Sequence, residues 1–249
     1  MEKQQVIYKD LGIMDYKTAW DYQEELVQQN REIKTKVREA VNCELLQTTD
    51  IEPATGNRQP ATVNHLLFCE HPAVYTLGKS GSMKNVLLSG KEMEEKEIEF
   101  FKTNRGGDIT FHGLQQVVGY PILDLENFYT DIGRYLRELE EVIIQTIAEY
   151  GLKGQRSKGE TGVWIEPGVI GRERKICAMG IRCSRWITMH GFALNVNTDL
   201  SYFENIIPCG IQNKQVTSIE KELNQKVSLQ EVKEKLKKNF SLIFNVEII

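Results

Sequence analysis

Two residues of the chain, Cys209 and Lys175, stand in local sequences that suit nucleophilic chemistry. Cys209 lies between Pro208 and Gly210, and these neighbours favour a tight bend that presents the thiol. A thiol is a strong nucleophile once it is deprotonated, and a lysine close to it lowers its pKa. Cys177 is the nearest thiol to Lys175 along the chain, whereas Cys209 can reach Lys175 only through the fold. Both thiols are therefore candidates, against the alternative that each is a small buried side chain.

The run KICAMGIRC, which Lys175 opens, is typical of a strand. Alternate side chains of a strand share a face, so we expect Lys175, Cys177 and Met179 to point the same way. A lysine that faces a cleft without a partner is costly to bury, which suggests a role for it. It would favour a thiolate or, once neutral, act as a general base. The alternative is an ordinary lysine in solvent at a strand edge.

The stretch NRGGDITFHG, residues 104–113, is a second candidate site. Two adjacent glycines, Gly106 and Gly107, allow a backbone to approach a ligand closely. Gly-Gly is also common in hairpin turns, and His112 alone reads equally well as a hydrogen-bonded core histidine. Pairing of Cys209 with His112 or His190 would make a cysteine hydrolase, but no hydrolase signature surrounds any thiol.

Other kinds of site find little support in the sequence. The run LGKSGS lacks the first glycine of a phosphate-binding loop, since Ala73 stands in its place. The four histidines are dispersed, with no carboxylate or thiol at ligand spacing, so we expect no metal site. We also expect no cofactor.

The composition is that of an ordinary globular protein. The chain has 249 residues, of which 41% are hydrophobic and 27% are charged, and we expect one domain over 1–249. A formal net charge of -4 argues against nucleic acid as a partner. Five cysteines without a C-x-x-C spacing argue against a disulfide framework. No apolar stretch is long enough to span a membrane, and the N-terminus lacks a signal-peptide pattern, so we expect a cytoplasmic protein.

Hydrophobic periodicity places the elements that would position these residues. Helices are expected from Asp15 to about Arg38, from Asp131 to about Ile147, and after Ser228, where Glu231 completes a capping box. Residues 41–63 should form an exposed loop insertion. Strands are expected in HLLFCEHPAVYTLG, with a break at its proline, and in VVGYPILDL, TGVWIE, KICAMGIRCS and MHGFALNV. This pattern predicts an α+β fold in which a sheet packs on helices.

Several of these segments, in this order, resemble the lipoyl(octanoyl)transferases of the biotin/lipoate protein ligase superfamily. The matching segments are EHPAVYTLGK (70–79), RGGDITFHG (105–113), VVGYPILDL (117–125), KICAMGIR (175–182), HGFALNVNTDL (190–200) and PCG (208–210). They cover most of the chain from Glu70 to Ile211. The resemblance implies a mixed, largely antiparallel β-sheet flanked by α-helices, like the catalytic domain of the biotin/lipoate ligases.

The resemblance also implies an activity, an octanoyl transfer from octanoyl-acyl carrier protein to a lysine of lipoyl domains. The acceptors would be the lipoyl domains of 2-oxoacid dehydrogenases and the glycine cleavage H protein, and a cysteine would carry the acyl group as a thioester. Cys209 matches the family's nucleophile, and Lys175 matches its lysine. The substrate-binding positions fall on Arg105, Gly106, Gly107, Asp108, Ile109, Thr110, Phe111, His112, Ala178, Met179, Gly180, Gly191, Phe192 and Ala193.

Two further expectations accompany the resemblance. An apolar tunnel for the acyl chain would be lined by residues such as Ile109, Phe111, Met179 and Phe192, each of which also suits a core. A basic patch for acidic carrier domains would be formed by Arg172, Arg174, Arg182 and Arg185, which read equally well as a solvated sheet edge.

The sequence departs from the family at one loop and leaves other activities open. The family usually continues Gly-Pro-Gly-Gln after the histidine, but here Leu114 and Gln115 replace the proline and the second glycine. The alternatives are an ATP-dependent lipoate ligase, an octanoyl amidotransferase between lipoyl domains, and a non-catalytic acyl-binding or carrier-binding protein.

Overall fold

The computed structural model describes residues 3–46, 61–207 and 215–249, with the backbone alone for 42–46. The strands are β1 (Gln4–Ile13), β2 (Asn64–Glu70), β3 (Val74–Leu77), β4 (Glu99–Lys102), β5 (Ile109–His112), β6 (Gln116–Ile122), β7 (Gly154–Ser157), β8 (Glu160–Ile165), β9 (Arg174–Ser184), β10 (Ile187–Asn195), β11 (Gln215–Val216) and β12 (Val246–Ile248). The helices are α1 (Tyr16–Leu46), α2 (Gly90–Glu95), α3 (Ile132–Ala148), α4 (Ile219–Leu223) and α5 (Leu229–Phe244), with short 3₁₀ helices η1 (Met83–Asn85), η2 (Leu125–Asn127) and η3 (Leu200–Asn205).

Two sheets form the framework of the described chain. The larger follows the order β12-β1-β2-β6-β10-β9-β8-β7, with β11 paired to β9, and the smaller follows β4-β3-β5. Within the larger sheet β2, β6, β10, β9, β8 and β7 pair antiparallel, while β1 pairs parallel with β2 and β12, and β11 pairs parallel with β9. The sheet is therefore mixed and mostly antiparallel, which confirms the predicted fold class.

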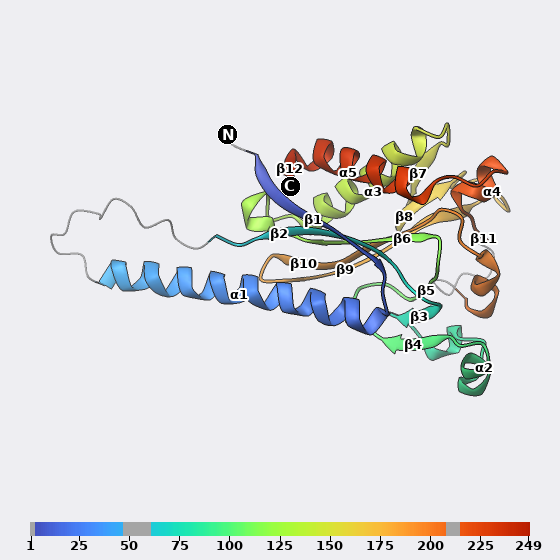
Figure 1. The fold of residues 1–249 in the computed structure, drawn as a ribbon, viewed down its shortest axis with the longest axis horizontal. Helices are drawn as coiled ribbons and strands as arrows, with labels where there is room; N and C mark the ends of the chain where they lie inside the picture. The colour runs from blue at the N-terminus through green and yellow to red at the C-terminus, as the bar shows by residue number, and fades with distance from the viewer. Residues whose placement is uncertain (1–2, 47–60, 208–214) are drawn as a thin grey trace.

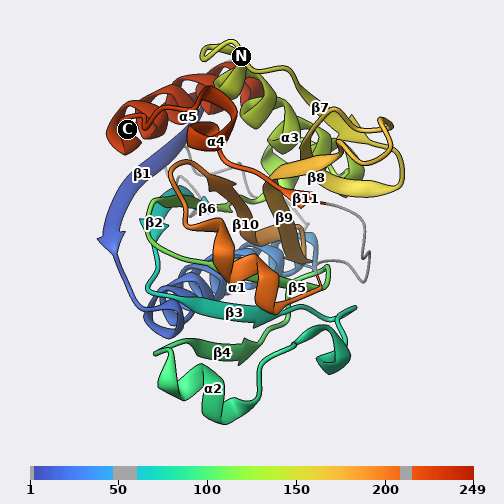
Figure 2. The same ribbon diagram turned by 90° about the vertical axis from the view of Figure 1, so that its right-hand side faces the viewer.

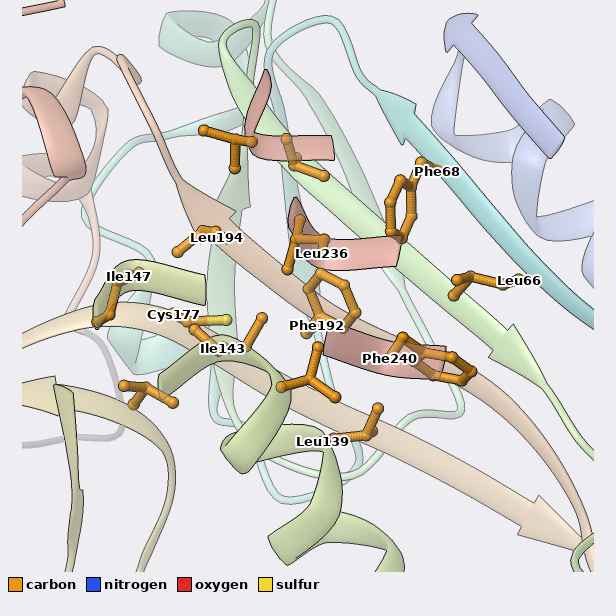
Figure 3. Packing of buried hydrophobic residues seen from close by; sticks show 14 of the residues in the cluster. Leu66, Phe68, Leu139, Ile143, Ile147, Cys177, Phe192, Leu194, Leu236 and Phe240 are labelled. Atoms are coloured by element: carbon orange, nitrogen blue, oxygen red, sulfur yellow. The ribbon is translucent and has the colours of Figure 1, made fainter. Parts of the chain in front are cut away.

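The helices cover both faces of the larger sheet (Figure 1). On one face α3 and α5 pack on a core that includes Phe68, Ile143, Phe192 and Phe240 (Figure 3). On the other face the long helix α1 packs on a second core drawn from β2, β6 and β10. The smaller sheet lies beside this face with α2 and has a core of its own (Figure 2). The first residue of α1, Tyr16, lies at a cavity between the two sheets.

Helix α1 is longer than the sequence pattern predicts. It continues to Leu46, so the expectation that the loop insertion begins at residue 41 is wrong for 41–46. The helix-breaking residues that suggested a loop, Pro53 and Gly56, come later in the chain, and nothing in VNCELL interrupts a helix. Residues 47–60 lie outside the described part of the chain. Midway along α1 the buried Lys34 ammonium donates to Asp124 Oδ1 at 2.7 Å and fastens the helix to the end of β6.

Two predicted helix starts and one predicted break between strands are confirmed. Asp131 caps α3 by accepting from the N–H of Arg134, and Ser228 caps α5 by accepting from the N–H of Glu231. The break at Pro72 separates β2 from β3, which belong to different sheets. No helix in the described ranges combines the length and apolarity needed to cross a bilayer.

Candidate active site

A cavity of about 510 Å³ lies between the two sheets, within the size range of small-molecule sites. Among the residues expected to bind substrate, those that line it are Arg105, Gly106, Gly107, Asp108, Ile109, Thr110, His112, Ala178, Met179, Gly180, Gly191, Phe192 and Ala193, together with Lys175. Segments more than 60 residues apart in sequence therefore meet at one cavity. Phe111 is the exception among these expected residues.

The floor of the cavity is made of small side chains on three neighbouring strands. Val118 of β6, Ala193 of β10 and Ala178 of β9 stand opposite one another in the register, so their side chains share a face. The next pair on the same face of the sheet is Gly191 and Gly180. Small side chains in the middle of a sheet leave open the volume that larger residues would fill.

The loop that begins at Arg105 lies directly over this floor. Gly106 donates its N–H to Ile181 O at 2.8 Å, and Lys79 donates its N–H to Arg105 O at 2.9 Å. A Cβ on Gly180 would lie 2.6 Å from Gly106 O, closer than real Cβ contacts. Only glycine at position 180 allows the loop to approach this closely, which explains why a glycine interrupts the strand.

The Arg105 side chain turns back to hold its own loop. Its guanidinium is buried and donates through Nη2 to Thr76 O at 2.5 Å and to Thr76 Oγ1 at 2.9 Å. Nη1 donates to Gly106 O at 3.0 Å. Three hydrogen bonds from one charged group fix the loop against β3, so Arg105 shapes the wall of the cavity.

His112 belongs to a buried hydrogen-bond chain beside the cavity. Its Nδ1 donates to Gln116 Oε1 at 2.9 Å, since that amide uses its nitrogen to donate to Asn195 Oδ1 at 2.8 Å. Its Nε2 then accepts from Thr76 Oγ1 at 3.3 Å. Burial, followed by the charges of His71 and Arg105, holds the pKa of His112 well below its ordinary value. His112 is therefore a neutral imidazole with a fixed tautomer.

Lys175 lies at the cavity while Cys177 does not, which corrects the expectation that they share a face. Lys175 is paired with Trp164 and Cys177 with Val163, so the intervening residue of β9, Ile176, is an extra residue in a β-bulge. The Lys175 ammonium lies 4.6 Å from the centre of the Trp164 ring. The Cys177 thiol lies in the core beneath α3, and burial raises its pKa (Figure 3). Cys177 is thus unsuited to act as a thiolate.

Of the two phenylalanines expected to line the acyl tunnel, Phe111 lies in a core instead, and Phe192 lies both at the cavity and in a core. The Phe111 ring stacks on Tyr202 with centroids 4.5 Å apart, inside the core of the smaller sheet. Phe192 borders the cavity, but its ring packs against Phe68 on the opposite face of the larger sheet (Figure 3). Strand alternation turns the Phe192 ring to the face opposite Ala193, and the stacking on Tyr202 holds the Phe111 ring in its core.

Further lining residues were not singled out by sequence reasoning. Tyr16, Tyr120 and Asn195 are among these additional lining residues. Tyr16 begins α1 and stacks on His112 at 5.8 Å, and Tyr120 donates to His71 Nε2 at 2.7 Å. The register of VVGYPILDL gives Tyr120 the same face as Val118, a signal that becomes usable once the strand partner is known.

The unusual loop after His112 is well supported. Gln115, in the position of the family's second glycine, adopts φ 62°, the left-handed region that favours glycine. Its N–H donates to Glu70 Oε2 at 2.8 Å, and its carbonyl accepts from Thr198 Oγ1 at 3.0 Å and from the N–H of Asn197 at 3.1 Å. These bonds stabilise the turn although Leu114 and Gln115 replace the proline and the second glycine.

The four arginines do not form an uncompensated basic patch. Arg172 and Arg174 pair with Glu166 at 2.8 Å and 2.5 Å, and Arg174 pairs also with Glu222. Arg182 pairs with Glu24 at 2.7 Å, while Arg185 donates to Thr35 Oγ1. The neighbouring carboxylates neutralise most of the charge, so the expected docking patch is wrong as a cluster of free positive charges.

Cys209 lies outside the described residues, but both flanks of its segment are anchored beside the cavity. Before it, Ile207 donates its N–H to Asn85 O at 2.8 Å. After it, Thr217 donates its N–H to Lys175 O at 2.9 Å, and its carbonyl accepts from Asn195 Nδ2 at 3.0 Å. The segment therefore begins at the smaller sheet and ends on β9 next to Lys175.

Comparison with known proteins gives consistent findings. The family model described as the lipoyl protein ligase A/B catalytic domain matches residues 15–241. A protein named octanoyltransferase from Christiangramia forsetii is 55% identical over 245 residues, covering 98% of this chain and 97% of its own. Another of that name from Flavobacterium psychrophilum is 56% identical over 242 residues, covering 97% of each. A solved bipartite lipoate protein ligase from Thermoplasma acidophilum matches the fold with TM-score 0.64 at 15% identity, covering 100% of this chain and 86% of its own.

Proposed function

This chain belongs to the lipoyl protein ligase A/B catalytic domain family, and from that premise we propose that it is an octanoyltransferase. The donor is octanoyl-acyl carrier protein, and the acceptor is a lysine of a lipoyl domain. The transfer proceeds through a thioester on Cys209. Relatives with the name octanoyltransferase that match nearly the whole chain at 55–56% identity support the activity.

The observation that carries the proposal is the cavity, where Lys175 meets a floor of alanine and glycine. The small side chains of Ala178 and Ala193 leave an apolar trough in the floor of the cavity, which suits an alkyl chain. Val118 and Tyr120 line the continuation of this trough on β6. A linear octanoyl chain is apolar along its length and gains about 0.8 kcal/mol for each CH₂ that it buries. The carbonyl end of the chain would lie at Lys175, which also lines the cavity.

The proposed reaction has two balanced steps. The Cys209 thiolate attacks the carbonyl carbon of the donor thioester, the carbon–sulfur bond to the carrier breaks, and the carrier leaves as a thiol after taking a proton. The lysine amine of the lipoyl domain then attacks the enzyme thioester, forms an amide, and releases the Cys209 thiolate. In the first step the Lys175 ammonium favours the thiolate and then gives its proton to the departing carrier thiolate. The neutral Lys175 amine receives the proton of the acceptor amine in the second step. Since the donor thioester is already activated, the transfer needs no ATP.

Intact mass spectrometry after mixing with octanoyl-acyl carrier protein tests this route. We expect an octanoyl adduct on the wild type and on Cys177→Ala, and none on Cys209→Ala. Addition of a lipoyl domain should clear the adduct and leave the domain octanoylated. Cys177→Ala is the matched control, because it removes the thiol nearest to Lys175 in sequence without touching the cavity.

Other outcomes would assign the chain to a rival activity. Octanoylation of the lipoyl domain from free octanoate and ATP, with no reaction of the acyl carrier protein, would make it a ligase. Transfer only from an octanoylated lipoyl domain would make it an amidotransferase. Binding of octanoyl carrier protein without any transfer, in wild type and Cys209→Ala alike, would make it an acyl-binding protein.

A further inference from the structure

Asn85, at the end of η1, connects the loop over the cavity with the segment that leads to Cys209. Its side-chain Nδ2 donates to Asp108 Oδ2 at 2.6 Å. Its backbone carbonyl accepts from the N–H of Ile207 at 2.8 Å. One residue therefore contacts the Arg105–Thr110 loop through its side chain and the 205–207 segment through its backbone.

The contact extends over neighbouring residues on each side. Leu87 donates its N–H to Asn205 O at 3.0 Å, and Val86 and Ile206 form an isolated antiparallel bridge. Residues 85–87 and 205–207 are thus paired like two short strands. This pairing fixes the position and direction of the chain at Ile207.

Asp108 anchors the other end of the contact. Its second oxygen, Oδ1, accepts from the N–H of Ile109 at 2.7 Å at the start of β5. A Cβ on Gly81 would lie 2.6 Å from the same oxygen, so the carboxylate is held against the 81–85 turn. Asp108 lines the cavity, yet both of its oxygens are engaged by protein groups, which argues against a direct role in holding the acyl chain.

We propose that Asn85 and Asp108 are positioning residues that set where the nucleophile stands relative to the cavity. The inference rests on the proposed function, in which Cys209 is the nucleophile. Ile207, the last described residue before Cys209, precedes it by only two positions in the sequence, so a change in the 85–87 pairing acts close to the nucleophile along the chain. A displacement of about 1 Å at a reacting group costs on the order of a hundredfold in rate.

The pair is built so that a charge swap tests it. Asn85→Asp places two carboxylates opposite each other, and Asp108→Asn places two amides there. The double variant Asn85→Asp with Asp108→Asn restores the hydrogen bond in reverse, since the new amide at 108 can donate to the new carboxylate at 85. Its carbonyl oxygen can still accept from the N–H of Ile109. If the pair only stabilised the fold, each single variant would lose melting temperature together with rate. A rate that falls in the single variants and recovers in the double variant, at an unchanged melting temperature, therefore indicates positioning.

The test measures the single-turnover rate of octanoyl adduct formation on Cys209 at saturating and subsaturating octanoyl-acyl carrier protein, with the melting temperature of each variant. We expect Asn85→Asp to lower the saturated rate about a hundredfold, with the half-saturating donor concentration nearly unchanged. The double variant should recover most of the rate. Asn127→Asp, an exposed asparagine of η2 that does not line the cavity, is the matched control and should behave as wild type.

Three results would overturn the inference in distinguishable ways. Equal saturated rates for Asn85→Asp and wild type would show that the pair does not position the thiol. A slow single variant with a lowered melting temperature and no recovery in the double variant would assign the pair to stability alone. Absence of an adduct on the wild type itself would instead refute the thioester route, and this inference with it.

Discussion

Acidification from pH 7.0 to 5.5 should destabilise this protein, because it buries neutral histidines beside a buried arginine. Burial lowers the pKa of His71 to about 4 and that of His190 to about 3, and it holds the pKa of His112 well below its ordinary value. The hydrogen bonds agree with neutral rings. His71 Nδ1 donates to Met14 O at 2.6 Å while its Nε2 accepts from Tyr120, so the ring carries one proton. Protonation would break the hydrogen bond from Tyr120 to Nε2 and leave a positive charge in a buried site.

The sign and size of the effect follow from linkage. The folded pKa of each histidine lies below the unfolded value of about 6.5, so the unfolded chain binds more protons as the pH falls. Stability is fully present above the unfolded pKa and decreases as the pH falls toward the folded pKa. Between pH 7.0 and 5.5 His71 and His190 each contribute a loss of about 1.3 kcal/mol, or about 2.5 kcal/mol together, and His112 adds to the loss in the same direction. Typical domains have only 5–15 kcal/mol in total, so the loss should be easily measured.

Carboxyl groups do not obscure this window. A glutamate such as Glu141, whose pKa is lowered first of all by the hydrogen bond from Gln145, contributes stability that is lost only below about pH 4.5. His65, which is partly buried, has a lowered pKa from the same main cause, burial, and adds to the loss in the same direction. The loss of stability measured above pH 5 therefore reports the protonation of the histidines.

Urea unfolding followed by circular dichroism at the two pH values, at constant ionic strength, measures the loss. His190→Gln removes one of the groups while its amide can still donate to Asn104 Oδ1, the partner of His190 Nε2 at 2.7 Å. This variant should lose about 1.3 kcal/mol less than the wild type between pH 7.0 and 5.5. A wild-type loss below about 1 kcal/mol would refute the reasoning. So would an identical loss in His190→Gln.

Two substitutions in the floor of the cavity separate its packing from its specificity. Gly191→Ala places a Cβ 2.2 Å from Gly119 O and 2.7 Å from Pro121 Cδ, and neither can move far, so we expect a loss of about 3 kcal/mol in the free energy of urea unfolding. Ala193→Leu should fill the trough and shift the preference toward shorter acyl chains, by about fourfold in kcat/KM for each CH₂ that no longer fits, as measured with carrier proteins bearing four to eight carbons.

Local patterns were sufficient to predict most elements of the fold. Apolar spacing and capping residues located α3 and α5, and the break at Pro72 correctly separated β2 from β3. The end of α1 was missed because helix propensity continues past residue 38 and the breakers lie further on. Sheet order could not be read from the chain, because strand pairing depends on contacts between distant segments.

The site was predicted well where the backbone is functional and less well where a side chain had to be oriented. Gly106 and Gly180 were expected at the site, and their close approach explains why residue 180 is a glycine. Asn85 carried no signal, since its role arises from two distant partners, Asp108 and Ile207. Phe111 was misplaced because an aromatic residue in a motif suits a core and a ligand site equally.

The β-bulge at Ile176 matters most, because it bears on the choice of nucleophile. With regular alternation Cys177 would have joined Lys175 at the cavity, and the extra residue turns it into the core instead. Burial raises the pKa of each of the three cysteines whose side chains the structure describes, Cys69, Cys177 and Cys183.

The two other thiols of the chain differ in their distance from the cavity. Cys43 lies 27 residues along α1 from Tyr16, which lines the cavity, and at 1.5 Å per residue that is about 40 Å away. Cys209 follows Ile207, which is anchored beside the Asp108 loop, and precedes Thr217, which is anchored on Lys175. The burial of the three described thiols and the distance of Cys43 along α1 therefore favour Cys209 for the proposed thioester, apart from the resemblance of PCG to a family motif.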